Sequence, residues 1–230
     1  MTVVVTGEAL VDLLIGHDGD VTAALGGGPF NTARTMSRLG VPAAYAGVLS
    51  HDRFGELLLA TLHADGVDDT LVQRTELPTT LAAAELDEHG AATYRFYVSG
   101  TAAPSLAPFV VPPTVTAVHA GTLGLVLEPM ATVTEQLVLG LADDVLLMVD
   151  INCRPKVVTD RGAYLERIRR VAGRADVVKV SGDDLDYLAG DDGNGSTATS
   201  AEAALRGLLD AGVRVVLHTD GGREIGRAHV

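Results

Sequence analysis

The feature that most constrains the fold is a repeated alternation of short β-branched runs with amphipathic helical stretches. Runs such as VVVTG (3–7), VLLMVDIN (145–152) and VVKVS (177–181) are short, apolar and rich in valine, which is typical of buried strands. The stretches between such runs carry apolar residues at helical spacing, and FGELLLATLHADG (54–66) is closed by a glycine, as many helices are. Strands that alternate with helices predict an α/β fold, in which helices cover both faces of a mostly parallel sheet.

One segment breaks this alternation. LAAAELDEHGAATYRFYV (81–98) holds two strand-like runs on either side of a polar turn that ends at Gly90. A hairpin inserted into a strand–helix alternation predicts a small accessory β-sheet.

The composition limits the possible partners. The 230 residues are 47% hydrophobic, enough for a sizeable core, and their net charge of −13 disfavours nucleic acid and anionic membranes as bulk partners. Cys153 is the one cysteine, so no intrachain disulfide can form. The apolar start has no basic region and no small-residue cleavage site, and no apolar run reaches about 18 residues. We therefore expect no signal peptide, no membrane span and a cytoplasmic protein.

Polar residues gather where the predicted strands end. In open parallel sheets, ligands bind beyond the carboxyl ends of the strands. The sequence therefore predicts a polar cleft at that edge. The residues at these positions are Asp12, Asp150, Asn152, Ser181, Thr219 and Gly221.

The stretch LGGGPFNTARTMSRLG (25–40) runs from three glycines into a predicted helix. Glycines permit close backbone approach, and a helix start offers unpaired N–H groups, so the segment suits an oxygen-rich ligand. Asn31 can donate and accept hydrogen bonds at once, as sugar hydroxyls require. A plain turn with Asn31 as the helix N-cap is the simpler alternative. A dinucleotide-binding fingerprint fits poorly, because about twenty residues separate the glycines from the first strand.

This stretch resembles the first signature of the ribokinase-like (PfkB) carbohydrate kinase family: two glycines, a short gap, Asn, a small residue and a helix ending in Leu-Gly. Segment 79–102, which resembles the family's β lid, and the VDINCRP segment are most similar to the fructokinase branch. The resemblance covers the chain to about residue 223. Further segments that resemble the family follow in the expected order: GEALVD (7–12), LSHDRFGELLLATLHADGV (49–67), TTLAAAELDEHGAATYRFYVSGTA (79–102), VDINCRP (149–155) and VVKVSGDDLDYL (177–188).

The resemblance implies ATP-dependent phosphorylation of a sugar hydroxyl, with Mg²⁺ as cofactor and a monovalent cation as an optional one. It also implies a β lid that excludes water, through which relatives often form homodimers. For the sugar it points to Asp12, Gly27, Gly28, Asn31 and the lid residues Tyr94, Arg95 and Tyr97. For ATP and its phosphates it points to Asn152, Arg154, Lys179, Ser181, Asp184, Thr219 and Gly221, with Arg154 supporting catalysis and Asp184 reaching Mg²⁺ through water.

Several of these residues keep simpler interpretations from the local sequence. Asp12 could cap nearby backbone, Arg95 could be a solvated strand residue, and Lys179 could be a surface charge. Asp183 and Asp184 could favour a helix start. The lid also lacks an Arg and an Asp that the fructokinase branch usually carries, so the identity of the sugar stays open.

The resemblance ends close to the C-terminus. The family's Gly-Ala-Gly-Asp segment supplies a general base and backbone N–H groups for the phosphate, and it is absent from these 230 residues. Residues 225–230 read Ile-Gly-Arg-Ala-His-Val, which is also the translation of one frame of a common sequencing-library adapter. We therefore expect a C-terminally truncated ribokinase-like domain over 1–223 and a non-native tail at 224–230. The lid insertion is expected around 79–102, with part of 10–25.

Two functions follow from these expectations. The first is a sugar kinase whose 230-residue form is inactive, because the general-base Asp would lie beyond Val230. The second is a non-catalytic sugar-binding protein or fragment. Truncation should also leave the strand VVLHT (215–219) without a neighbour on its outer edge.

Overall fold

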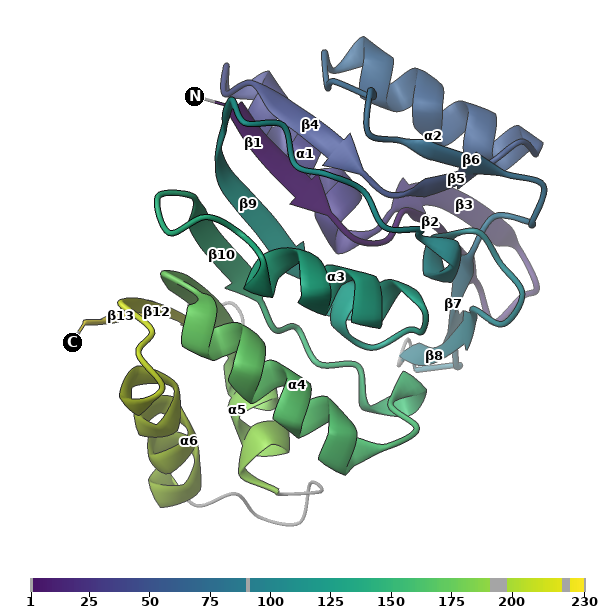
Figure 1. Cartoon of the computed structure of the whole chain (residues 1–230). Coiled ribbons are helices and arrows are strands. Elements are labelled where there is room, and N and C mark those ends of the chain that lie inside the picture. The colour runs from purple at the N-terminus through teal and green to yellow at the C-terminus, as the bar shows by residue number, and fades with distance from the viewer. Residues whose placement is uncertain (1, 90–91, 191–197, 221–223, 230) are drawn as a thin grey trace.

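A seven-stranded sheet runs through the molecule (Figure 1). This computed structural model describes residues 2–89, 92–190, 198–220 and 224–229. Six neighbouring strands are parallel, and the seventh, β13, is antiparallel to β12 at the edge. In spatial order the strands are β13 (Glu224–His229), β12 (Val215–Asp220), β11 (Val177–Ser181), β10 (Leu146–Asp150), β9 (Val115–Gly121), β1 (Thr2–Thr6) and β4 (Ala43–Ala46).

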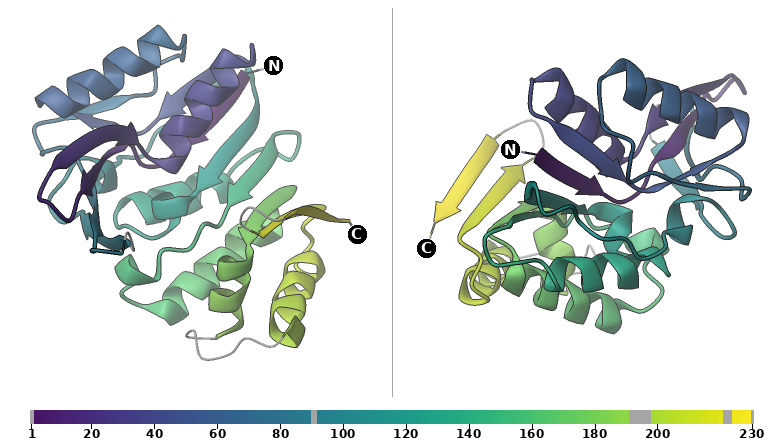
Figure 2. Two further views of the ribbon diagram at one scale, coloured as in Figure 1. Left: turned by 180° about the vertical axis from the view of Figure 1, so that it is seen from behind. Right: turned by 45° about the horizontal axis from the view of Figure 1, so that its top comes forward.

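Helices lie on both sides of this sheet (Figure 2). Side chains of β1, which lies between β9 and β4, alternate between two cores, as a period of two requires. Val3 and Val5 pack with Phe30 in one core, whereas Val4 packs with Leu147 and Ile168 in the other. The predicted α/β fold with a covered parallel sheet is confirmed. The helices are α1 (Gly28–Arg38), α2 (Arg53–Ala64), α3 (Met130–Leu139), α4 (Arg161–Arg174), α5 (Gly182–Ala189) and α6 (Ala198–Asp210).

None of the helices in the described part of the chain is both long and apolar enough to cross a bilayer.

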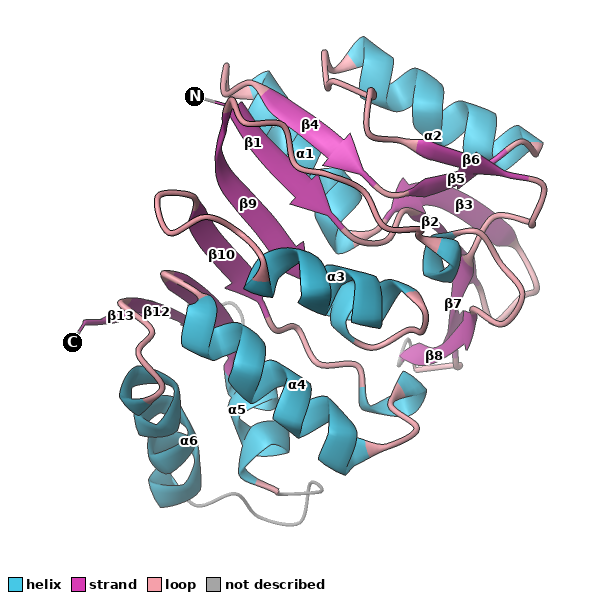
Figure 3. Cartoon of the chain, viewed as in Figure 1, coloured by secondary structure: helices cyan, strands magenta, loops and turns pink. Residues whose placement is uncertain are grey.

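A second, four-stranded sheet stands beside the main one (Figure 3), and we call it the lid sheet. Its strand order is β3 (Val21–Gly26), β2 (Leu10–Ile15), β7 (Leu81–Leu86) and β8 (Ala92–Tyr97). β7 and β8 pair antiparallel, so the predicted hairpin is confirmed, and β2 pairs parallel with β7. The remaining elements are a two-stranded sheet of β5 (Val48–Ser50) and β6 (Gln73–Thr75), and the 3₁₀ turns η1 (Ala103–Ser105), η2 (Thr122–Leu125) and η3 (Pro155–Val157).

The outer edge of β12 differs from the expectation. β13 pairs with it along its length, from Val215 opposite His229 to Asp220 opposite Glu224. The expectation of an unpaired outer edge is therefore wrong, because β13 is an antiparallel neighbour of β12 on that edge.

Gly121 joins β9 to the turn η2 in a backbone conformation that only glycine adopts easily. Its φ is 148°, and an added Cβ would lie 1.9 Å from the backbone oxygen of Asp150 on the neighbouring strand. Both the backbone angle and the lack of space exclude a side chain here. The close approach of β9 and β10 positions the two loops that follow these strands.

We expect Gly121→Ala to lower the free energy of unfolding by about 2–5 kcal/mol, because the new methyl group must strain or displace β10. Gly207→Ala is the matched control. Gly207 lies on α6 with no heavy atom within 4 Å of an added Cβ, so this change should be neutral or stabilise by up to about 1 kcal/mol. Urea unfolding of both variants measures the difference. Equal stabilities would contradict this account of Gly121.

Candidate functional site

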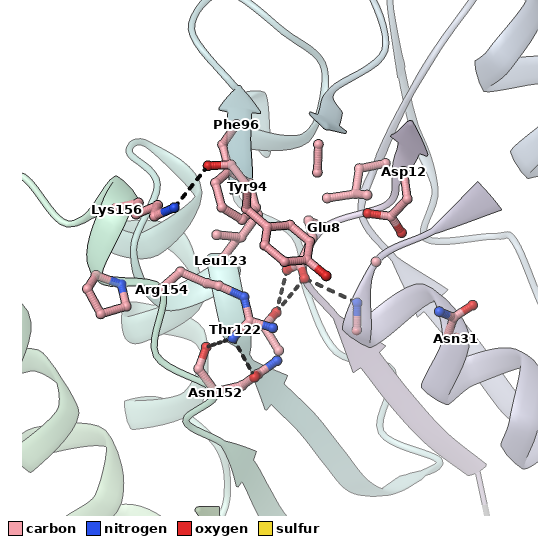
Figure 4. A pocket seen from close by; sticks show the side chains of 15 residues that line it. Glu8, Asp12, Asn31, Tyr94, Phe96, Thr122, Leu123, Asn152, Arg154 and Lys156 are labelled. Atoms are coloured by element: carbon pink, nitrogen blue, oxygen red, sulfur yellow. Dashed lines mark hydrogen bonds between the residues drawn. The ribbon is translucent and has the colours of Figure 1, made fainter. Parts of the chain in front are cut away.

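A cleft of about 540 Å³ lies between the lid sheet and the carboxyl ends of β1, β9 and β10 (Figure 4). It brings together seven of the residues predicted for the site, namely Asp12, Gly27, Gly28, Asn31, Tyr94, Asn152 and Arg154. The other residues that line it are Glu8, Leu10, Ala82, Phe96, Thr122, Leu123, Pro155 and Lys156.

A buried carboxylate, that of Glu8, joins three segments at the base of this cleft. Its Oε1 accepts a hydrogen bond from the backbone N–H of Gly28 at 3.2 Å. The hydroxyl of Thr122 lies 2.6 and 2.5 Å from the two carboxylate oxygens and donates to this group. Glu8 thus ties the end of β1 to the start of α1 and to the turn after β9. Burial raises the pKa of Glu8 to about 7, although the bonds from Thr122 and Gly28 act in the opposite direction.

The glycine-rich loop passes directly over the end of β1. Gly27 is the N-cap of α1 with a φ of 109°, and an added Cβ would lie 2.5 Å from the carbonyl oxygen of Glu8. Asn31 lies within the helix, and its backbone N–H donates to the Gly27 carbonyl at 3.0 Å. The interpretation of Asn31 as the N-cap is therefore wrong, because the helix starts earlier and no side chain caps it. The amide of Asn31 lines the cleft instead.

Asp12 and Arg154 place opposite charges in the cleft. The carboxylate of Asp12 accepts no hydrogen bond within the described part of the chain, so it is not used to cap backbone. Partial burial raises its pKa, and the positive charge of Arg154 opposes that rise. Arg154 Nη1 donates to Asn152 Oδ1 at 2.7 Å and to the carbonyl of Cys153 at 2.9 Å, which holds the guanidinium at the edge of the cleft.

Of the two faces of β8 in the lid, one lines the cleft. Tyr94 and Phe96 line the cleft, whereas Arg95 and Tyr97 do not. Arg95 is exposed and forms an ion pair with Glu85 at 2.8 Å, and Tyr97 is 53% exposed. Arg95 and Tyr97 thus lie on the opposite face of β8 from Tyr94 and Phe96, because alternate residues of a strand point to opposite faces. Their contact with the sugar stays a prediction.

Asp184 is used by the protein backbone. Its Oδ1 accepts from the N–H of Cys153 at 2.5 Å, and its Oδ2 accepts from the N–H and the hydroxyl of Ser181, each at 2.7 Å. With Ser181 it forms a capping box at the start of α5. The buried side chain therefore ties the start of α5 to the loop after β10. Its expected approach to Mg²⁺ through water stays a prediction.

Three further residues predicted for the phosphates, Lys179, Ser181 and Thr219, lie on β11 and β12, outside the cleft lining. Lys179 forms an ion pair with Asp150, with 3.2 Å between Nζ and Oδ1. Ser181 caps α5, and the Thr219 hydroxyl donates to the carbonyl of Val180 at 3.5 Å. Gly221 lies outside the described residues. No group of three or more His, Cys, Asp or Glu side chains in the described ranges could hold a metal ion.

Among the lining residues that sequence reasoning missed, four bring a polar or aromatic side chain: Glu8, Thr122, Phe96 and Lys156. Glu8 lies two residues after β1 and Thr122 directly follows β9, so the rule that ligands bind at the carboxyl ends of strands could have found them. Phe96 shares the alternation of β8 with Tyr94. Lys156 donates to the backbone carbonyl of Tyr94 at 3.4 Å across the cleft, and no sequence signal points to that contact.

Comparison with known proteins identifies the family to which this chain belongs. A family model, pfkB family carbohydrate kinase, matches residues 2–225. The chain belongs to the pfkB family of carbohydrate kinases.

Among curated members of the pfkB family, the chain is similar to fructokinases. It is 36% identical over 190 residues to a fructokinase of Rhizobium leguminosarum bv. trifolii, covering 79% of this chain and 58% of the relative. It is 32% identical over 204 residues to fructokinase-1 of Zea mays, covering 83% and 63%. The chain therefore spans less than two thirds of the length of these two relatives.

Solved pfkB-type structures agree with the fold. The fructokinase of Xylella fastidiosa with bound ATP has a TM-score of 0.85 at 25% identity, covering 99% of this chain and 74% of that one. A double mutant of Vibrio cholerae fructokinase, with fructose, ADP and potassium ion bound, has a TM-score of 0.84 at 25% identity, covering 99% and 73%. The ribokinase-like architecture expected from the sequence is confirmed.

The raised pKa of Glu8 predicts a pH-dependent stability. A carboxyl with a higher pKa in the folded state binds its proton more tightly there than in the unfolded chain. Its contribution to the free energy of unfolding therefore falls as pH rises from its ordinary pKa of 4.5 to its folded-state pKa of about 7. We expect the free energy of unfolding of the wild type, relative to Glu8→Gln, to decline over that range by at most about 1.4 kcal/mol per pH unit. Urea titrations at several pH values measure this slope.

Glu166→Gln controls for the loss of one negative charge, because Glu166 has an exposed side chain on α4. A relative stability of wild type and Glu8→Gln that is flat or rises with pH would contradict the assigned environment of Glu8.

Proposed function

We propose that the cleft is the acceptor subsite of an ATP-dependent sugar kinase of the fructokinase type. We further propose that the 230-residue chain alone binds the sugar without phosphorylating it. The observation that carries the proposal is the convergence of Asp12, Asn31 and the Gly27–Gly28 backbone on one cleft with Arg154 at its edge. Membership of the pfkB family and the fructokinase names of its relatives support the same substrate class.

The sugar end of the cleft offers complementary groups for hydroxyls. Asp12 brings a carboxylate that can accept from hydroxyls, and Asn31 brings an amide that can donate and accept. Tyr94 and Phe96 add aromatic surface on the lid side, which suits the C–H faces of a sugar ring and displaces water. The lid sheet is also the surface for the expected homodimer, which stays a prediction.

Arg154 is the cation best placed for the transferring phosphate. Phosphoryl transfer depends mainly on positioning and on charge stabilisation, and a held guanidinium supplies both. Asn152 Oδ1 accepts a hydrogen bond from the Arg154 guanidinium. The residue between these two, Cys153, donates its backbone N–H to Asp184, which holds the loop in place. ATP would supply the phosphoryl group, and Lys179 is a second cation that could hold its phosphates. The described residues do not provide a ready acidic cluster for Mg²⁺, so we derive no step through the metal.

The proposed lack of turnover rests on the sequence. The 230 residues contain no Gly-Ala-Gly-Asp segment, and the resemblance assigns the general base to that segment. Without a positioned base, the sugar hydroxyl keeps its proton and remains a poor nucleophile.

Sugar binding can be measured by calorimetry with fructose, ribose and glucose. We expect one of them to bind, and Asp12→Asn to weaken its binding roughly ten- to hundredfold, as expected for the loss of hydrogen bonds to a charged group. Asp143→Asn, on the exposed loop before β10, is the matched control and should bind as the wild type does. Failure of all three sugars to bind the folded chain would contradict the proposed acceptor subsite.

Phosphoryl transfer needs a separate assay with ATP, Mg²⁺ and the sugar that binds best. We expect no sugar phosphate above the level given by Asp12→Asn purified in the same way, which controls for contaminating host kinases. Turnover by the wild type that the Asp12→Asn preparation lacks would overturn the inactivity of this chain, and would leave the sugar site supported.

A further inference from the structure

The orientation of the Asn31 amide decides what this part of the sugar site can bind. An amide side chain presents either a carbonyl oxygen or an NH₂ group to a ligand, and the two differ only by a flip. Asn31 is exposed to the cleft, and it does not cap its helix. A capping contact with the helix backbone therefore does not fix the flip, whereas a contact with a neighbouring side chain can.

Arg34 lies one turn further along α1 and supplies such a contact. Its Nη1 donates to Asn31 Oδ1 at 3.4 Å. Because a guanidinium has only donors, it can bind the oxygen end of the amide and not the NH₂ end. Figure 4 shows the amide nitrogen of Asn31 on the cleft side and its oxygen turned away.

Arg34 is itself held firmly, so its contact with Asn31 has a defined direction. Its Nε donates to Asp65 Oδ2 at 2.6 Å, and its guanidinium lies 5.2 Å from the centre of the Phe30 ring. The Arg34 side chain is only 18% exposed, and Asp65 caps the C-terminal end of α2. An anion, an aromatic ring and a neighbouring helix thus fix the guanidinium.

We propose that Arg34 is a positioning residue that fixes the Asn31 amide with its NH₂ group toward the cleft, so that this position binds an acceptor oxygen of the sugar. The inference rests on the proposed sugar site and adds that Asn31 donates a hydrogen bond to the sugar. Arg34 does not line the cleft, so it acts on the sugar only through Asn31.

Arg38 offers a matched control. Its Nε donates to the other oxygen of Asp65 at 2.7 Å, so Arg34 and Arg38 share the same anion on the same helix. The side chain of Arg38 is 61% exposed and makes no contact with Asn31 in the described structure. Replacing Arg38 removes a positive charge and an Asp65 contact, and leaves the amide contact intact.

A double-mutant cycle tests the inference by calorimetry with the sugar that binds best. We expect Arg34→Met to weaken binding about three- to tenfold, the value of one hydrogen bond, and Arg38→Met to change it less than twofold. In an Asn31→Ala background, Arg34→Met should have no further effect. Arg34→Lys should behave as Arg34→Met does, because the single ammonium group of a lysine that pairs with Asp65 cannot also reach the Asn31 amide as the separate Nη1 of arginine does. Arg34→Lys also provides the test if Arg34→Met fails to fold.

Other results would overturn the inference. If Arg34→Met and Arg38→Met weaken binding equally, Arg34 acts only through general charge or stability. If Arg34→Met weakens binding as much in the Asn31→Ala background as in the wild type, it does not act through the amide. If the wild type binds none of the sugars, the proposed function itself fails, whereas normal binding by every Arg34 variant refutes this inference alone.

Discussion

The buried carboxylate of Glu8 is the interaction on which the rest of the site depends. Burying a carboxylate is costly unless donors surround it, and here the donors come from the start of α1 and from the turn after β9. Those donors, Gly28 and Thr122, belong to segments far apart in the chain. Their common acceptor fixes the glycine-rich loop against the sheet edge, and this loop in turn places Asn31.

A second buried carboxylate, Asp184, serves the other end of the site in the same way. It joins the start of α5 to the loop that carries Asn152 and Arg154. Glu8 and Asp184 therefore fix the loops around the cleft by hydrogen bonds to backbone and hydroxyl groups. Polar groups that face the cleft, such as Asp12, remain available to a ligand. Because structural and ligand-facing acids are different residues, loops at the edge of the sheet can form a defined site.

Much of the fold follows from the sequence, because buried parallel strands have a clear apolar signature and the runs at 3–7 and 177–181 carry it. The glycine-rich loop was also predictable, since consecutive glycines indicate a close approach of two backbone segments. In the structure Gly27 lies against the backbone of Glu8. The lid face was not predictable, because the alternation of Tyr94, Arg95, Phe96 and Tyr97 defines two faces without saying which one is covered. For Asp184 the sequence offered both a helix start and a ligand contact, and it could not decide between them, because a capping box and a ligand contact place an acid at the same position of a helix start.

An amide chemical-shift titration of the ¹⁵N-labelled chain with the sugar that binds best tests most directly whether this cleft is the sugar site. We expect saturable shift changes at Gly27, Gly28, Asn31 and Thr122, with little change on α4 and α6, which lie away from the cleft. Shift changes confined to α4 and α6, or none at the glycine-rich loop at saturating sugar, would contradict the assignment of this cleft as the sugar site.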